Sequence, residues 1–157
     1  MGLCSGEYLA KFAEKLISAK HQVHEYGLDL TVANIYAVKK AGDIDFGGSE
    51  LKEAMVEEVP SVKRSVEDSH GWWTLAAGQY IVEFNEKVII PDGCSATIQP
   101  RYDTLSAGVF HPTITYVSGE KVAKTVLVVG KSGFNIKENA RISVLRGAQD
   151  NGGVCNG

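Results

Sequence analysis

The sequence predicts an all-β domain with one helix at its N-terminal end. From Trp72 onward, short runs of β-branched and aromatic residues recur, and Gly, Asn, Pro or Asp separates them. Such spacing is typical of a sandwich, a jelly roll or a closed barrel. The chain has 157 residues, 44% of them hydrophobic, which is enough for the core of one domain but little for two. We therefore expect a single β domain.

The N-terminal segment has the spacing of an amphipathic helix. Between Ser5 and Lys20, apolar side chains recur every three or four residues with charged side chains between them, and Ser5 can cap the first turn. The pattern predicts one helix over residues 5–20 and a break at 21–27. We take residues 1–26 as this helix and its linker.

The β domain is expected over residues 27–146. Residues 28–36 alternate as a strand does, and residues 41–71, with Gly47-Gly48 and many charges, predict a surface excursion that is partly turn or helix. Further strands are expected at residues 79–84, 87–90, 95–99, 109–117, 122–129 and 141–145. The glycine-rich residues 147–157 have little apolar content and predict a flexible tail.

Composition excludes several classes of partner. The formal net charge of −3 gives no basic surface for nucleic acid, although a small phosphorylated ligand is compatible with it. No run of eighteen apolar residues occurs and no secretion signal is evident, so we expect a cytoplasmic protein without a membrane partner. Cys4, Cys94 and Cys155 are scattered, without the spacing of a zinc site, and we expect no protein-bound metal cluster.

Four stretches resemble, in the same order, the archaeal branch of the dUTPase and dCTP deaminase superfamily. Residues 27–36 (GLDLTVANIY) and 42–46 (GDIDF) are similar to its G-x-D-L opening and its G-x-I-D-F strand. Residues 73–91 resemble its glycine turn and two strands closed by proline. Residues 100–109 (PRYDTLSAGV) stand where the family has P-R-S-S and a G-V step, and residues 133–145 are similar to its G-x-R-I-x-Q-L strand.

The resemblance implies a distorted jelly-roll β-barrel and a homotrimer with active sites between subunits. It also implies a dUTP diphosphatase, which converts dUTP to dUMP and pyrophosphate with Mg²⁺. That chemistry needs neutralised phosphate charge, donors to the phosphates and a carboxylate that activates water.

The motif after residue 100 is only partly kept. Arg101 remains as a substrate-binding candidate, but Tyr102 and Asp103 replace the serine pair that helps to hold phosphate. This exchange removes two small donors and adds a negative charge, which repels phosphate unless a cation lies between them. Asp103 then becomes a candidate catalytic carboxylate in a rearranged site, and Tyr102 a candidate substrate contact.

Two further motif positions bear on the site. Arg141 is kept in the last strand, as either a phosphate ligand or an ion-pair residue at the barrel rim, while Val144 stands at the expected glutamine. Asp29 keeps the aspartate of the first motif, which implies structural support of the site.

The hairpin after the G-V step differs most. An ungapped comparison places Tyr116 where the family has its water-activating aspartate. Glu120 is the only carboxylate among residues 104–137, so it is the candidate that could replace the missing one. His111, at the start of the same hairpin, is the one histidine placed to contact a substrate.

Three functions remain open. The losses in one site favour a divergent relative that keeps the trimer and deoxynucleotide binding but has lost much of its catalytic site. The alternative is an active dUTPase with Mg²⁺ and a rearranged site; deamination is less supported, because residues 122–129 contain no glutamate. An unrelated jelly-roll binding module is the third reading.

Overall fold

The computed structural model describes residues 2–150, and it is mostly β with only short helices. No helix among these residues is long and apolar enough to cross a membrane. The elements in chain order are β1 (Gly2–Leu3), α1 (Gly6–Ala10), β2 (Ala13–Glu14), α2 (Ala19–Gln22), β3 (Val23–His24), β4 (Gly27–Lys40), β5 (Met55–Glu58), β6 (Trp72–Leu75), β7 (Gly78–Ile89), β8 (Cys94–Pro100), α3 (Tyr102–Ser106), β9 (Val109–Phe110), β10 (Ile114–Val117), β11 (Lys121–Val129), β12 (Phe134–Lys137) and β13 (Arg141–Gln149).

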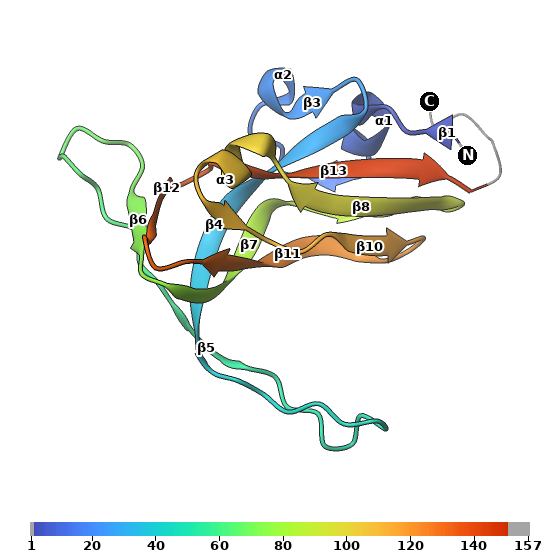
Figure 1. Cartoon of the computed structure of the whole chain (residues 1–157). Coiled ribbons are helices and arrows are strands. Elements are labelled where there is room, and N and C mark those ends of the chain that lie inside the picture. Colours follow the sequence, from blue (N-terminus) through green and yellow to red (C-terminus); the bar gives the residue numbers. More distant parts are fainter. Residues whose placement is uncertain (1, 151–157) are drawn as a thin grey trace.

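Most strands form one curled antiparallel sheet (Figure 1). Its main path in the described residues runs β10-β8-β13-β4-β7-β11-β9, and β6 and β12 form a separate pair. The long strand β4 pairs with β13 near Leu28 and with β7 from Val32 onward. Register shifts in both pairings mark irregularities of the kind that increase local twist, so the sheet curls into a half-barrel around its core.

The core follows the two-residue period of the strands. In β7, buried and partly exposed side chains alternate, and Val82, Phe84 and Val88 are fully buried. The prediction of a mainly β fold is therefore confirmed, with strands at each predicted stretch. The stretches 79–84 and 87–90 join in one strand, β7, because Glu86 between them points into the core and is bonded there. The stretch 109–117 is divided into β9 and β10, with Pro112 between them.

The single helix predicted over residues 5–20 is wrong. Ser5 caps α1 as expected, its hydroxyl accepting from the Tyr8 amide at 3.1 Å, but α1 ends at Ala10. Ala13 and Glu14 pair with β7 instead, and Lys15 adopts a φ of 61° that no α-helix continues through. The side chain of Gln22 then accepts the amides of residues 17 and 18, which replaces helical bonds. The apolar spacing reflects packing onto the sheet.

Residues 41–58, which we call the arm, form the largest departure from the body. They continue β4 and return along β5, and in Figure 1 this long hairpin projects away from the sheet. The surface excursion was expected over residues 41–71, and the described structure has turns, bends and strand over these residues but no helix. The backbone of Lys52 approaches Gly42 so closely that a β-carbon would not fit, which explains the glycine.

The last strand extends further than the predicted boundary. β13 continues to Gln149 and pairs there with the start of β8 and with β1. The remainder of the predicted tail, residues 151–157 with Cys155, lies outside the described residues. Cys4 and Cys94 are both buried in the core.

Candidate active site

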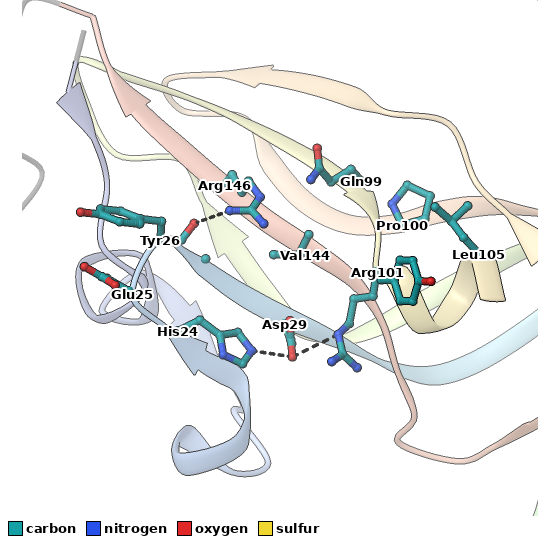
Figure 2. Close-up of a pocket in the computed structure, with 12 residues that line it drawn as sticks. His24, Glu25, Tyr26, Asp29, Gln99, Pro100, Arg101, Leu105, Val144 and Arg146 are labelled. Carbon is teal, nitrogen blue, oxygen red and sulfur yellow. Dashed lines mark hydrogen bonds and ion pairs between the residues drawn. The ribbon is translucent and has the colours of Figure 1, made fainter. Parts of the chain in front are cut away.

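A buried carboxylate on β4 is the centre of the candidate site. The side chain of Asp29 is 2% exposed, and its Oδ2 lies 2.8 Å from Nε2 of His24, 3.1 Å from Nη1 of Arg141 and 3.3 Å from Nε of Arg101. Figure 2 shows His24 and Arg101 approaching Asp29 from opposite sides. One carboxylate thus holds two guanidinium groups together. Charges of such low exposure need a partner of opposite charge.

The two arginines come from adjacent strands of the sheet. Arg101 directly follows β8 and precedes the first turn of α3, and its backbone amide donates to the carbonyl of Ile142 at 3.0 Å. Arg141 opens β13, opposite Thr31 of β4. Because β13 lies between β8 and β4, both arginines reach Asp29 across the sheet. The hydroxyl of Thr104 donates to the same Ile142 carbonyl at 2.7 Å and fixes α3 in place.

His24 is a site residue that the sequence reasoning missed. It pairs with Gly27 in the β3–β4 hairpin, which turns its ring toward Asp29. Gly6 of α1 lies against the backbone of His24 and Gly27 at a distance that excludes any β-carbon, so the N-terminal segment supports this hairpin. A histidine close before the motif aspartate and separated from it by a glycine turn was the available signal.

A cavity of about 540 Å³ opens beside this cluster. Its wall includes Arg101 and Arg146. Nη1 of Arg146 donates to the carbonyl of Tyr26 at 3.3 Å. Two aromatic side chains, Tyr26 and Tyr102, also line it, and both are exposed. The volume lies within the usual range for small-molecule sites of about 300–1,000 Å³.

The charges around the cavity nearly balance. Arg101 and Arg146 supply cations, while Asp29 and Glu25 supply carboxylates. Oδ2 of Asp29, however, is already occupied by its three donors, and Nη1 of Arg101 lies 3.5 Å from Asp103 and donates to the Arg141 carbonyl at 3.4 Å. Nη2 of Arg101 is therefore the nitrogen that the described residues leave available to an anion. The cavity can therefore bind a phosphate by directed donors and a flat ring by its tyrosines.

Asp103 and Tyr102 lie where the motif predicts them, at the start of α3. The side chain of Asp103 is largely exposed, and its Oδ2 lies 3.5 Å from Nη1 of Arg101. Such an exposed pair contributes little to stability and leaves the carboxylate oxygens accessible. Tyr102 is 82% exposed although it lines the cavity.

The hairpin residues lie elsewhere in the same chain. Glu120 occupies the turn between β10 and β11, where its Oε2 accepts from the amide of Val117 at 2.8 Å. Tyr116 lies on β10 in a different cavity, and burial, with a further contribution from Glu120, raises the pKa of its hydroxyl. Neither residue lines the cavity beside Asp29 within one chain.

His111 is buried rather than presented to solvent. Its Nδ1 donates to the carbonyl of Pro112 at 2.9 Å, and its Nε2 accepts from the hydroxyl of Ser143 at 2.7 Å, the tautomer that satisfies both neighbours. Burial lowers the pKa of the imidazole. The ring therefore joins β13 to the segment after β9.

A second buried carboxylate, Glu86 of β7, supports the part of β4 that carries Asp29. Its Oε1 accepts from the amide of Thr31 at 2.7 Å, from the Thr31 hydroxyl at 2.6 Å and from Nε2 of Gln22 at 3.1 Å. The same Gln22 nitrogen donates to the carbonyl of Asp29 at 3.0 Å. Burial raises the pKa of Glu86, and these hydrogen bonds oppose the rise. No sequence signal identified this residue.

The residues at the cluster do not form a protein-only site for Mg²⁺. The Asp29 carboxylate faces two guanidinium groups and an imidazole, and no group of three metal-ligating side chains occurs in the described part of the chain. Asp103 is the accessible carboxylate there. Mg²⁺ in nucleotide sites usually relies on one or two carboxylates and on the substrate phosphates. This donor set alone does not fit the ion.

Comparisons with known proteins agree with the fold and with the motifs. No family model matches. The chain is 34% identical over 134 residues to a Methanosarcina mazei protein named "Probable deoxyuridine 5'-triphosphate nucleotidohydrolase", covering 84% of this chain and 75% of that protein. A protein of the same name from Archaeoglobus fulgidus is 25% identical over 153 residues, which covers 92% of this chain and 86% of the other.

A solved structure shares the fold. The dCTP deaminase of Agrobacterium tumefaciens superposes with a TM-score of 0.66 at 15% identity, over 93% of this chain and 46% of the longer chain. The mostly antiparallel β structure and the sequence similarity to these relatives together define the class of protein. The chain belongs to the dUTPase and dCTP deaminase superfamily, among relatives of the archaeal dUTPases.

Proposed function

We propose that this protein is a dUTPase-related homotrimer that binds a deoxynucleoside triphosphate but has lost most of the hydrolytic activity. The observation that carries the proposal is the cavity beside Asp29, where Arg101 and two exposed tyrosines lie together. Arg101 would hold a phosphate, and Tyr26 or Tyr102 would stack on the base or the sugar. dUTP is the first candidate ligand, because the archaeal relatives are named for it.

Binding would depend on Asp29 acting indirectly. Its carboxylate fixes the directions of Arg101 and Arg141 and offsets part of their charge, so the guanidinium groups are oriented before the ligand arrives. Arg141 does not line the cavity, so it would act by helping to position Arg101. Asp103 would face the phosphates and weaken binding unless Mg²⁺ accompanies the nucleotide.

Loss of hydrolysis follows from the absence of a carboxylate at the usual place. Tyr116 stands at the position of the water-activating aspartate, and Glu120 is engaged with the backbone of its own turn. A phenol with a raised pKa is a poor general base near neutral pH. Orienting the phosphates without activating water leaves a binding site rather than an efficient hydrolase.

The trimer is part of the proposal because one chain leaves the site divided. Arg101 and Asp103 follow β8, whereas Tyr116 and Glu120 belong to the β10–β11 hairpin. In a homotrimer with a closed jelly-roll barrel, the hairpin of one subunit would approach the Arg101 cluster of the next. The superfamily resemblance supports this arrangement.

The second candidate is an active dUTP diphosphatase with a rearranged site. It is favoured by the printed names of relatives that are 34% identical to this chain. In this case Glu120 of a neighbouring subunit would turn toward the bound nucleotide and, with Asp103, replace the missing aspartate. Mg²⁺ would then be required with the substrate.

One experiment separates the two candidates. Pyrophosphate release is measured with dUTP, dCTP and dTTP in the presence of Mg²⁺, and a non-hydrolysable dUTP analogue is titrated by calorimetry. We expect saturable binding of the analogue with little or no turnover. Turnover that disappears in Glu120→Gln would establish the enzyme, and the absence of both binding and turnover would refute both candidates.

A further inference from the structure

The arm exposes apolar side chains that its own chain does not cover. Every residue of the arm is exposed except Asp45, and Ile44 and Phe46 are 92% and 109% exposed, so Phe46 is in full contact with solvent. Leu51 and Met55 add further exposed apolar surface. A two-stranded hairpin without a packed face is marginally stable in water, and clustered apolar exposure of this kind indicates a binding surface.

A complementary cavity lies on the sheet itself. It has a volume of about 350 Å³, is largely apolar, and is formed by β7, β10 and β11. Lys121 and Lys124 also line it, and neither makes an ion pair within the described residues. The apolar side chains that line this cavity include Ile81, Ile114, Tyr116 and Val126.

The charges of the two surfaces are opposite. Residues 41–58 contain six carboxylates and one lysine, whereas the cavity contains two lysines and no carboxylate. Apolar side chains flanked by acids on one surface thus match an apolar cavity flanked by lysines on the other. Such complementarity favours a specific contact over general association.

We propose that the arm of one copy inserts Phe46 and Ile44 into the β7–β10–β11 cavity of a second copy. The arm projects away from its own sheet (Figure 1), and its exposure shows that it makes no such contact within one chain. Because arm and cavity are different surfaces, the contact is head-to-tail and can close into a ring. The inference rests on the self-association proposed above and names its surfaces.

This contact would also act on the candidate site. Tyr116 belongs to the cavity and lies on the same hairpin as Glu120. A neighbouring arm seated there would hold the β10–β11 hairpin in one position. The β10–β11 hairpin, which differs most from the family motif, would then help to join the copies.

The test measures the mass and self-association of the full chain by light scattering and sedimentation. We expect the wild type to form a closed oligomer, and the double variant Ile44→Ser, Phe46→Ser to associate about tenfold or more weakly. Phe110→Ser is the matched control, because Phe110 is 52% exposed and lies outside both surfaces. This control should keep the wild-type mass.

A charge exchange provides a second and independent test. Lys121→Glu with Lys124→Glu should weaken association, and adding Glu50→Lys with Glu53→Lys in the same chain should restore it at least in part. Circular dichroism verifies that each variant is folded. Restoration would establish that these two surfaces meet.

The results that overturn the inference are distinct from those that overturn the proposed function. If the arm variants and the lysine variants all keep the wild-type association constant, the copies assemble through other surfaces and this inference is wrong, while the trimer stands. If the wild type is monomeric at every concentration tested, both the inference and the trimer are wrong. Titration of the dUTP analogue tests nucleotide binding separately.

Discussion

The Nη1 atom of Arg141 lies 3.1 Å from Oδ2 of Asp29, an oxygen of a carboxylate that is almost completely buried. Arg101 approaches the same oxygen from the end of β8. The single negative charge therefore holds together two groups that would otherwise repel each other. Three strands, β4, β8 and β13, contribute to this contact, so it joins the candidate site to the centre of the sheet.

We expect Asp29→Asn to lower the free energy of unfolding by about 3 kcal/mol, because breaking a buried pair leaves its partner charges uncompensated. The partial exposure of both arginines keeps the loss near the lower end of the range for buried pairs. Urea denaturation measures the change. The matched control is Asp92→Asn, an exposed aspartate, which should change stability by about 0.5 kcal/mol or less. Equal stability of the two variants would show that Asp29 does not hold the cluster together.

Substitutions of Arg101 and Arg141 should have different effects on nucleotide binding. Arg101 lines the cavity and Arg141 does not, although both contact Asp29. We expect Arg101→Gln to weaken binding of a non-hydrolysable dUTP analogue about tenfold or more, the cost of one charge-assisted hydrogen bond. Arg141→Gln should affect stability more than affinity.

Calorimetric titration gives the affinities. Lys131→Gln, which removes a positive charge from an exposed turn, is the control for long-range electrostatics and should bind as the wild type does. An Arg101 variant that binds the analogue with wild-type affinity would exclude this cavity as the phosphate site.

The strands were predictable because their signals are local. Alternation in residues 79–84 and glycine or proline between the runs place strands without knowledge of their neighbours. The order of the sheet was not predictable from the residues, since the central position of β4 depends on pairing with both β7 and β13. The prediction of one N-terminal helix was wrong because it also depended on contacts that the local sequence does not show. Ala13 and Glu14 pair with β7, and the side chain of Gln22 accepts hydrogen bonds from the amides of residues 17 and 18.

The residues of the candidate site were likewise predictable only where the sequence carries a local signal. The motif order identified Asp29, Arg101 and Arg141, which the structure brings together. His24 and Glu86 were missed, because their contacts depend on the register of the β3–β4 hairpin and on which face of β7 is buried. A histidine or a glutamate carries no local signal of such a partner.

Thr125 offers a test of packing in β11. Its side-chain oxygen is buried and has no hydrogen-bond partner among the described residues. We expect Thr125→Val to raise the free energy of unfolding by about 1 kcal/mol, since valine has nearly the same shape and removes an unsatisfied hydroxyl. Urea denaturation measures the difference.

Thr104→Val is the matched comparison for that change. The Thr104 hydroxyl is also buried, but it donates to the carbonyl of Ile142 at 2.7 Å. This variant should lose about 1 kcal/mol, because it removes a hydrogen bond that is made. The prediction for β11 would be refuted if Thr125→Val destabilised the protein as much as Thr104→Val does.

The buried His111 should make stability depend on pH. Burial lowers the pKa of its imidazole below the usual 6.5, and the neutral ring is the form that accepts from Ser143. Below about pH 6.5 the unfolded state therefore binds more protons than the folded state, so stability falls as the pH is lowered toward the folded-state pKa. Glu86, whose pKa is raised, acts in the opposite sense at pH values above the usual carboxyl pKa of 4.5. Subtracting the curve of His111→Asn from that of the wild type isolates the contribution of the histidine. Urea midpoints from about pH 7.5 to about pH 5.5 should fall in the wild type and in the exposed control His21→Asn, and fall less in His111→Asn. Parallel curves for all three proteins would mean that His111 does not control this dependence.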